Sequence, residues 1–441
     1  MLYPLSYRGL LSDSTMPDNS HVCSAPDSGT SIRMTPSRHQ SAPAFEQITS
    51  QSRLDELCDA ARDAGRIAID TEFLWEKTYA PLICLAQLNV DGHVAIADPI
   101  EGIDLTPLAS LVADPAVQVV MHAPHADLVA FALRHDVVPT NIFDTQLAAG
   151  FIGLSAGLSY ERLVAEVAGA RVQPSESFTD WSRRPLNARQ LRYAGEDVEH
   201  LFTMTDAISD KLHALGRTAW AHEELSRRFE DPLRITTQPD QAWRKVSRRG
   251  KLGSVELAVL REAAAWRERT ARRRDIPTSW VMKDPTIVEI ARRKPVDARD
   301  LMRIRGIDQG LRHADQQELI TAVARGCEDA ITESTPSYPR SVRRRINVAK
   351  GLATALLRAR CEGADMAPEL VGTSSDVEEL IAWVALGDQG KTDLATPALM
   401  QGWRQQFGTD LVDLVAGRIS LALSDADPYL VIQPTEPGSD A

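Results

Sequence analysis

The sequence lacks a Cys-x-x-Cys pair, and it lacks any apolar run near the roughly 20 residues that a membrane span needs. Its five cysteines are an odd number and lie far apart, which excludes a disulfide framework and a zinc ribbon and indicates reduced thiols in a cytoplasm. Basic residues are not in excess either: 49 Lys and Arg against 61 Asp and Glu give a formal charge of −12. The chain is therefore not a uniformly basic nucleic-acid binder, and any basic patch must be local.

The length of 441 residues suggests about two to four domains. The first residues are rich in Ser, Pro, Asp and Thr and show no period, which predicts disorder. Strand-like runs with helices interleaved after them then indicate an α/β domain with a mixed sheet, and the chain beyond Pro239 has helical spacing. We predict a disordered extension over 1–45, an α/β domain over 46–235, a helical module over 245–330, a linker over 331–342, a second helical module over 343–422 and a loose acidic tail over 423–441.

Within the α/β domain, hydrophobic periodicity separates strands from helices. The predicted strands are "RIAID" (66–70), "ICLAQLNV" (83–90), "HVAIAD" (93–98) and "VQVVMHA" (117–123). The predicted helices are "QSRLDELCDAARDAG" (51–65), "PHADLVAFALRHD" (124–136), "NIFDTQLAAGFI" (141–152), "SYERLVAEVAG" (159–169) and one long helix over 187–216.

The first strand contains an unusual pair of acids. Asp70 and Glu72 follow the apolar run Ile67–Ile69. Residues i and i+2 of a strand point to the same face, so the two carboxylates lie side by side and repel each other. The pair therefore requires a positive group between its members, or it destabilises the strand.

Two further stretches add oxygen ligands to this pair. Asp127 lies early in a helix after a strand, and Tyr193 and Asp197 share one helix face a turn apart. Hard divalent cations prefer oxygen ligands, and two ions roughly 3.5–4 Å apart can stabilise the attacking and leaving oxygens of a phosphodiester. The set predicts two-metal hydrolysis, with Tyr193 orienting the attacking water.

Each element alone has a structural alternative. An Asp-x-Glu on a strand is more often a solvated face, Tyr-x-x-x-Asp is usually a surface pair, and Asp127 fits an N-terminal helix acid. We interpret Asp144, in "FDTQ", as an N-cap. The ordered combination of four acids and a tyrosine favours catalysis.

That combination resembles the DEDDy 3′→5′ exonucleases, and the ribonuclease D family in particular. "DTEF" with "EKTYAP", "HAPHADL" and "SESFTDWSRRPLNARQLRYAGEDVEHL" are similar to the three motifs of the family, over about residues 50–215. The resemblance implies a ribonuclease H-like exonuclease domain that uses two divalent ions, Mg²⁺ or Mn²⁺. It makes Asp70, Glu72, Asp127 and Asp197 the metal ligands and Tyr193 the water-orienting catalytic residue.

The first helical module resembles an HRDC domain, a small nucleic-acid-binding module, through "LREAAAWRERTARRRDIPTSWVMKDPTIVEIARRKP". The second module is similar to a diverged copy of it. Residues 243–274 carry eleven bases and three acids, a formal charge of +8. A solvated helix face is the alternative, but the neighbouring nuclease domain favours phosphate contacts. The candidate residues are Arg248, Arg249, Arg272, Arg273 and Arg274, and we also consider base stacking on Trp243 and, less so, on Trp266, which favours a core position.

We therefore expect a metal-dependent 3′→5′ exoribonuclease that releases nucleoside 5′-monophosphates. The resemblance implies structured RNA as the substrate, tRNA precursors among it, with no membrane partner and no small-molecule cofactor. One alternative is a DNA exonuclease with the same site, since no residue here identifies a reader of the 2′-hydroxyl. The other is a catalytically silent nucleic-acid-binding adaptor, although clustered, repelling carboxylates argue against it.

Overall fold

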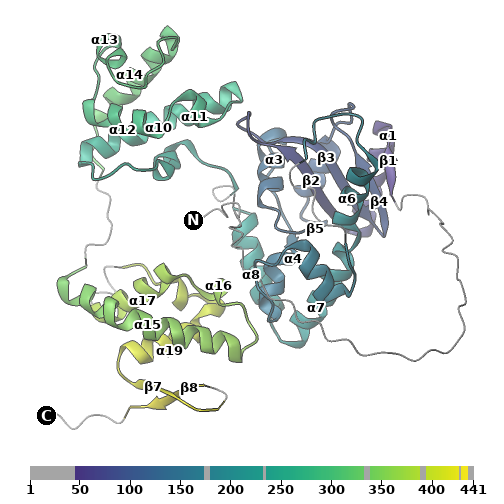
Figure 1. The fold of residues 1–441 in the computed structure, drawn as a ribbon, viewed down its shortest axis with the longest axis vertical. Helices are drawn as coiled ribbons and strands as arrows, with labels where there is room; N and C mark the ends of the chain where they lie inside the picture. The colour runs from purple at the N-terminus through teal and green to yellow at the C-terminus, as the bar shows by residue number, and fades with distance from the viewer. Residues whose placement is uncertain are drawn as a thin grey trace, which may run out of the picture. The chain divides into compact units, whose positions relative to one another are not determined.

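Residue-level structure comes from a computed structural model (Figure 1). The predicted extension over 1–45 lies outside the described residues except for residue 45, as do most of the predicted linker and the end of the predicted tail. The described residues are 45–172, 179–231, 235–331, 338–387, 394–426 and 429–435.

The described part of the α/β domain is built on one mixed sheet with the strand order β1-β4-β3-β2-β5-β6. The pairs β2/β3 and β3/β4 are antiparallel, and the pairs β1/β4, β2/β5 and β5/β6 are parallel. The strands are β1 (Glu46–Ile48), β2 (Arg66–Leu74), β3 (Leu82–Val90), β4 (His93–Ala97), β5 (Gln118–Met121) and β6 (Ile142–Asp144). The α/β class and the mixed sheet are thus confirmed.

Helix α1 shows how local signals place the central strand. The Ser50 side chain caps its first turn by accepting from the backbone N–H of Arg53, and Gly65 ends it with a left-handed φ of 68°. Gly65 has the φ > 0 that residues with a side chain rarely adopt, and β2 begins at the next residue. Ile67 and Ile69 are then fully buried in the sheet core.

The helices pack against both the sheet and one another. Helix α6 contacts β2, β3 and β4, whereas α1 contacts β2 and β3 through its buried residues Leu54, Leu57, Cys58 and Ala61. The helices of this domain are α1 (Gln51–Ala64), α2 (Thr106–Val112), α3 (His125–His135), α4 (Thr145–Ala149), α5 (Tyr160–Leu163), α6 (Ala188–Glu199), α7 (Leu201–Ala214) and α8 (Thr218–Phe229), with short turns η1 (Gly150–Ile152) and η2 (Val164–Ala168).

Three sequence predictions are corrected here. Residues 142–144 form strand β6 before α4 begins, although the segment was predicted as helix. The predicted long helix over 187–216 is two helices, because α6 ends at Glu199 and α7 begins at Leu201, with His200 between them. Strand β1 was not predicted, since three residues are too few for a periodic signal.

The first helical module has a core of its own, in which α10 contacts η3, α12 and α14. Trp243 and Trp266 are 4% and 2% exposed, so the suggestion that Trp243 stacks on bases is wrong: both rings belong to this core. The elements are η3 (Pro239–Lys245), α10 (Ser254–Arg274), α11 (Thr278–Val281), α12 (Asp284–Arg293), α13 (Ala298–Met302) and α14 (His313–Cys327).

The second module is also helical, and its end corrects the predicted tail. Strands β7 (Ile419–Leu423) and β8 (Leu430–Pro434) pair as an antiparallel hairpin, so the described residues from 423 onward are not loose. The helices are α15 (Arg340–Gly363), α16 (Pro368–Val371), α17 (Ser374–Leu386) and α19 (Gln405–Val415), with turns η4 (Ala398–Met400) and η5 (Gly402–Arg404). Among the described helices, none has the length and the apolar content to cross a bilayer.

The contact between α10 and α14 provides a test of the fold. A Cβ added at Gly326 on α14 would lie 2.5 Å from the Cα of Val259 on α10, closer than real Cβ contacts. The nearest atoms are backbone atoms of Val259 and Ala258, which cannot rotate away. Gly326→Ala should therefore force the helices apart and destabilise the module by about 1–3 kcal/mol. We expect a lower thermal midpoint of the full chain or of this module within it.

Gly351 on α15 is the matched control. An added Cβ there meets nothing within 4 Å, so Gly351→Ala should stabilise the helix by about 0.5–1 kcal/mol. An unchanged midpoint for Gly326→Ala would contradict the close packing of α10 on α14.

Candidate active site

Strand β2 supplies two carboxylates near its carboxyl end. Asp70 pairs in register with Gln87 of β3, and Glu72 pairs with Leu85. A register shift follows directly after Glu72, and such a bulge bends the strand and redirects the side chains beside it. The predicted strand placement of both acids is confirmed.

Helix α6 brings a third carboxylate to this pair. The Asn187 side chain accepts from the N–H of Gln190, whose own side chain accepts from the N–H of Asn187, so a capping box fixes the start of the helix. Tyr193 and Asp197 then lie one turn apart, and the Tyr193 hydroxyl hydrogen-bonds to the Asp197 carboxylate.

Three of the four predicted acids converge. One carboxylate oxygen from each of Asp70, Glu72 and Asp197 lies within 4.8 Å of the others, a separation at which the group could hold a metal ion. All three side chains are partly accessible, so an ion and a substrate can reach them.

The fourth acid approaches from α3. Asp127 is buried in the first turn of that helix, and its Oδ1 accepts a hydrogen bond from the hydroxyl of Thr71, the residue between the two β2 acids. The turn before α3 is held by Asp144, which accepts from the N–H of Ala123 at 2.9 Å and caps α4 through Gln146. The N-cap role predicted for Asp144 is confirmed.

The metal-free cluster favours protonated carboxyl groups. Burial and then the charges of Asp197 and Asp127 raise the pKa of Glu72 to about 9. Burial raises the pKa of Asp197 to about 8, against the opposing hydrogen bond from Tyr193, and that of Asp127 to about 6. Burial and the neighbouring acids raise the pKa of Asp70 well above its ordinary value. A bound cation would reverse each of these shifts.

The segment before α6 is tied to the sheet. The ring of Trp181 lies against the ring of Tyr193, with centroids 6.1 Å apart. Arg184 donates to both oxygens of Asp98 at 2.6 Å and to the carbonyl oxygen of Cys84 at 2.8 Å. These contacts restrict the position of Tyr193. The catalytic role predicted for Tyr193 requires such a fixed position.

Two residues of the site were missed by sequence reasoning. Thr71 orients Asp127, and a hydroxyl between two acids gave no separate signal. Gln87 is fully buried opposite Asp70, and both atoms of its amide lack a hydrogen-bond partner within the described part of the chain. A lone Gln inside the apolar run of β3 was the available signal, because buried polar groups normally have partners.

The basic stretch divides into paired and exposed side chains. Arg273 and Arg274 form ion pairs with the buried Asp315 of α14, and Arg272 lies over the ring of Tyr79 at 5.6 Å. Their charge is therefore partly engaged within the protein.

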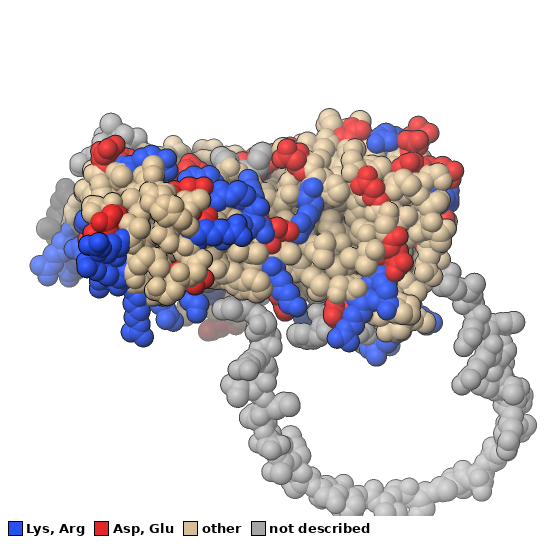
Figure 2. Space-filling view, turned by 90° about the horizontal axis from the view of Figure 1, so that it is seen from above, with Lys and Arg blue, Asp and Glu red and all other residues tan. Residues whose placement is uncertain are grey.

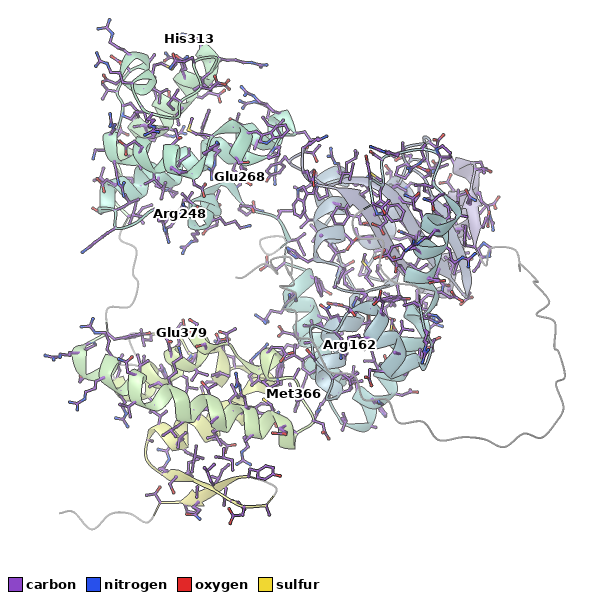
Figure 3. All side chains as sticks on the ribbon, in the orientation of Figure 1. Arg162, Arg248, Glu268, His313, Met366 and Glu379 are labelled. Atoms are coloured by element: carbon purple, nitrogen blue, oxygen red, sulfur yellow. The ribbon has the colours of Figure 1, made fainter. Side chains whose placement is uncertain are left out.

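Arg249 lies 5.2 Å from the ring of Trp243. Arg248 is exposed, and it forms no ion pair with a described residue; it lies on the same helical module as Glu268 (Figure 3). Figure 2 shows Lys and Arg side chains gathered in several places on the visible face, with Asp and Glu side chains among them.

Comparisons with known proteins agree with this geometry. A family model described as 3′-5′ exonuclease matches residues 45–213, which contain all five predicted catalytic residues. A second, described as HRDC domain, matches residues 256–323 in the first helical module. The fold and the site thus define a 3′→5′ exonuclease with an attached HRDC domain.

Relatives cover nearly the whole length. Ribonuclease D of Acidiphilium cryptum is 35% identical over 86% of this chain and 96% of its own, and that of Granulibacter bethesdensis is 35% identical over 88% and 97%. The crystal structure of Escherichia coli RNase D aligns with a TM-score of 0.67 and 28% identity, over 85% of this chain and 98% of that one. The chain belongs to the ribonuclease D family.

The raised pKa values predict how metal affinity depends on pH. Near pH 7 the metal-free site retains protons on Glu72 and Asp197, whose pKa values are about 9 and about 8, and an ion must displace them. We expect the affinity for Mn²⁺ to rise from pH 6.5 to pH 9. The rise should be steepest below pH 8, where both groups retain protons, and at most on the order of tenfold per pH unit for each displaced proton. Titration of the full chain with Mn²⁺, followed by electron paramagnetic resonance, measures this.

Stability should change in the opposite sense without metal. A carboxyl group whose folded pKa is raised contributes stability below its unfolded pKa and loses it as pH rises through the folded value. The thermal midpoint of the metal-free protein should therefore fall between pH 6.5 and pH 9 and recover with Mn²⁺. A Mn²⁺ affinity independent of pH would contradict binding at these carboxylates.

Proposed function

We propose that this 3′→5′ exoribonuclease is metal-dependent and releases nucleoside 5′-monophosphates from structured RNA. The observation that carries the proposal is the convergence of Asp70, Glu72 and Asp197 on one point with Tyr193 bonded to one of them. Three carboxylates with oxygens within 4.8 Å of one another repel each other unless they are protonated or bound to cations, and metal-assisted hydrolysis needs the cation-bound state.

The donor set fits two hard divalent cations, Mg²⁺ or Mn²⁺. Asp70, Glu72 and Asp197 would hold one, and Asp127 would complete the second site together with the β2 acids. When bound, such ions stabilise the negative charge on the attacking and leaving oxygens of a phosphodiester. Thr71 would orient Asp127 through its hydroxyl.

We assign to Tyr193 the role of orienting the attacking water. Its hydroxyl already reaches the Asp197 carboxylate, and its ring is held by Trp181. A hydroxyl fixed at that place can hold a water molecule in line with the terminal phosphodiester while the carboxylates remain ligands. The partly accessible site would admit the 3′ end of a chain. The water oxygen would bond to the last phosphorus as the bond from that phosphorus to the 3′ oxygen of the preceding nucleotide breaks. The last nucleotide then leaves as its 5′-monophosphate, and the shortened chain keeps a 3′-hydroxyl.

The substrate class is inferred from the relatives and from charge. The E. coli protein is described as an exoribonuclease involved in structured RNA processing, and we propose the same class here, with tRNA precursors as its first candidates. Arg248 and Arg249, with Arg272, Arg273 and Arg274, are proposed to contact phosphates, of which the exposed Arg248 is the most available. DNA remains a second substrate to test, since no described residue identifies a 2′-hydroxyl reader.

Asp70→Asn tests the metal site. Loss of a shared ligand should abolish cleavage, because stabilisation of several kcal/mol by the ions corresponds to roughly 10³-fold or more in rate. The measurement compares 3′-labelled and 5′-labelled RNA and DNA with Mg²⁺, Mn²⁺ or chelator. Wild type should release labelled mononucleotide from the 3′ end at once and should be inactive with chelator.

Asp59→Asn on α1 is the matched control, since Asp59 is an exposed acid whose ion pair among the described residues is with Arg62. It should leave cleavage unchanged. The metal-free Asp70→Asn protein should be at least as stable as wild type, because a repelling charge is removed. If it cleaves within a few-fold of wild type at limiting metal, the two-metal assignment is wrong.

Tyr193→Phe separates water orientation from metal binding. A positioned proton-handling group contributes about 10²–10⁴-fold to rate, so kcat should fall within that range while Mn²⁺ affinity and RNA binding stay nearly constant. Asp197→Asn should instead weaken Mn²⁺ binding, and excess Mn²⁺ should restore part of its activity. Metal titration of both variants distinguishes them.

Tyr160→Phe is the comparison for losing a buried tyrosine hydroxyl. Tyr160 donates to the carbonyl oxygen of Glu196 at 2.7 Å, so its loss should lower stability by about 1 kcal/mol with kcat within a few-fold of wild type. Full activity of Tyr193→Phe, or rescue of its defect by metal, would make Tyr193 a packing residue.

A further inference from the structure

Helix α15 is the first helix of the second module, and nearly all of its charged residues are basic. Residues 340–361 contain seven basic residues and no acid, in a chain whose formal charge is −12. This run is separate in the sequence from the basic stretch 243–274, and it lies outside the segment that matches the HRDC model.

Three of the seven bases serve the module itself, and each bonds to a neighbouring helix. They are Arg345 with the carbonyl oxygen of Val415, Lys350 with Glu378 and Arg360 with Asp410. The side chains of the other four are exposed and form neither an ion pair nor a hydrogen bond with any described residue: Arg340, Arg343, Arg344 and Arg358.

Helical geometry aligns most of these free arginines. At 3.6 residues per turn, Arg340, Arg344 and Arg358 lie within about 40° of one another around the helix and span about 27 Å along it. The buried side chains Val342, Ile346, Ala353, Leu356 and Leu357 lie on the opposite side and attach the helix to its module.

Two large apolar side chains lie beside this row, between Arg344 and Arg358 along the helix. By the same geometry, Val348 is about 40–80° and Leu352 about 80–120° around the helix from the three arginines. Val348 is 70% exposed and Leu352 is 53% exposed. A helix face that only needs to be soluble has no reason to place bulky apolar groups beside free arginines, because polar residues are favoured there. We call Arg340, Arg343, Arg344, Arg358, Val348 and Leu352 the α15 basic face.

We propose that the α15 basic face is an RNA-binding surface that holds substrate at a distance from the metal site. The free guanidinium groups would pair with phosphates in bidentate fashion, and Val348 and Leu352 would contact ribose and base faces. Charge complementarity selects RNA as the occupant. The surface ends at Glu362, the first acid along the row. The proposal rests on the RNA substrate proposed above.

Such a surface would act on binding rather than on chemistry. Cleavage needs only the last phosphodiester at the carboxylates, whereas contacts elsewhere lengthen the time that a long RNA stays bound. A short oligonucleotide that fills only the metal site should therefore be indifferent to the α15 basic face, and a long structured RNA should not.

The test uses the full chain with Arg340, Arg344 and Arg358 all changed to Gln. Binding of an RNA hairpin with a 12-nucleotide 3′ tail is measured with chelator present, over a range of NaCl concentrations. We expect about tenfold weaker binding at 0.15 M salt and a log–log salt slope smaller by about 2, from three lost phosphate contacts. Cleavage of a trinucleotide with Mg²⁺ should be unchanged.

Two further variants keep the test sharp. The control changes Arg62, Arg171 and Lys211, three exposed bases of the exonuclease domain, to Gln, and it should bind the hairpin like wild type. Replacing the three α15 arginines by Lys should retain the salt slope of wild type, because the charges remain. If the substitutions instead changed the fold, the Lys variant and the Gln variant would both lose that slope. Thermal midpoints of all variants should match.

Several outcomes would overturn the proposal. Wild-type affinity in the Gln variant would do so, as would an equal loss in the control, which would show a general charge effect. A shift from dimer to monomer in the Gln variant without loss of RNA binding would identify a second copy of the chain as the occupant. Failure of wild type to shorten RNA from the 3′ end would count against the proposed function instead, because the binding assay contains no metal.

Discussion

Mutual repulsion of carboxylates is the constraint on which the exonuclease domain depends. Burial first, and neighbouring acids after it, raise the pKa values of Glu72 and Asp197 to about 9 and about 8 without metal, so the surrounding fold holds these carboxyl groups close together although ionising them is costly. It does so with elements that are rigid for independent reasons. The central strand β2 pairs on both sides, and α6 begins at a capping box. Asp144 accepts from the backbone N–H of Ala123 in the turn before α3 and from that of Gln146 in α4.

The same constraint explains why polar contacts cluster around the site. Thr71 bonds to Asp127, Tyr193 bonds to Asp197, and Gln87 is buried beside Asp70 with its amide unpaired within the described residues. A cluster that exchanges protons for cations, as we propose, benefits from neutral groups that adapt to either state. Fixed positive side chains would instead occupy the place of the ions, and no described Lys or Arg forms an ion pair with any of the four acids.

Sequence patterns predicted what is periodic and local. Strands β2 to β5, the shared face of Asp70 and Glu72, and the one-turn spacing of Tyr193 and Asp197 all follow from side-chain period, so they were predicted correctly. The break at His200 and the three residues of β6 were missed, because tertiary contacts and not periodicity decide them. The bond from Thr71 to Asp127 joins residues 56 positions apart, which no local pattern can detect.

Charge shows the same division between local and long-range information. The run 243–274 has the more basic sequence, yet Arg273 and Arg274 meet Asp315, some 40 residues along the chain, and a buried acid beside them cancels charge that the sequence counts as free. Helix α15 has a less conspicuous run, in which the side chains of four arginines pair with no described residue. A phosphate responds to unpaired charge at a surface and not to the sum over a segment. We therefore favour α15, which lies outside the HRDC match, over the run 243–274 as the surface that binds RNA. At the carboxylates, the proposed reaction involves only the last phosphodiester bond of the RNA.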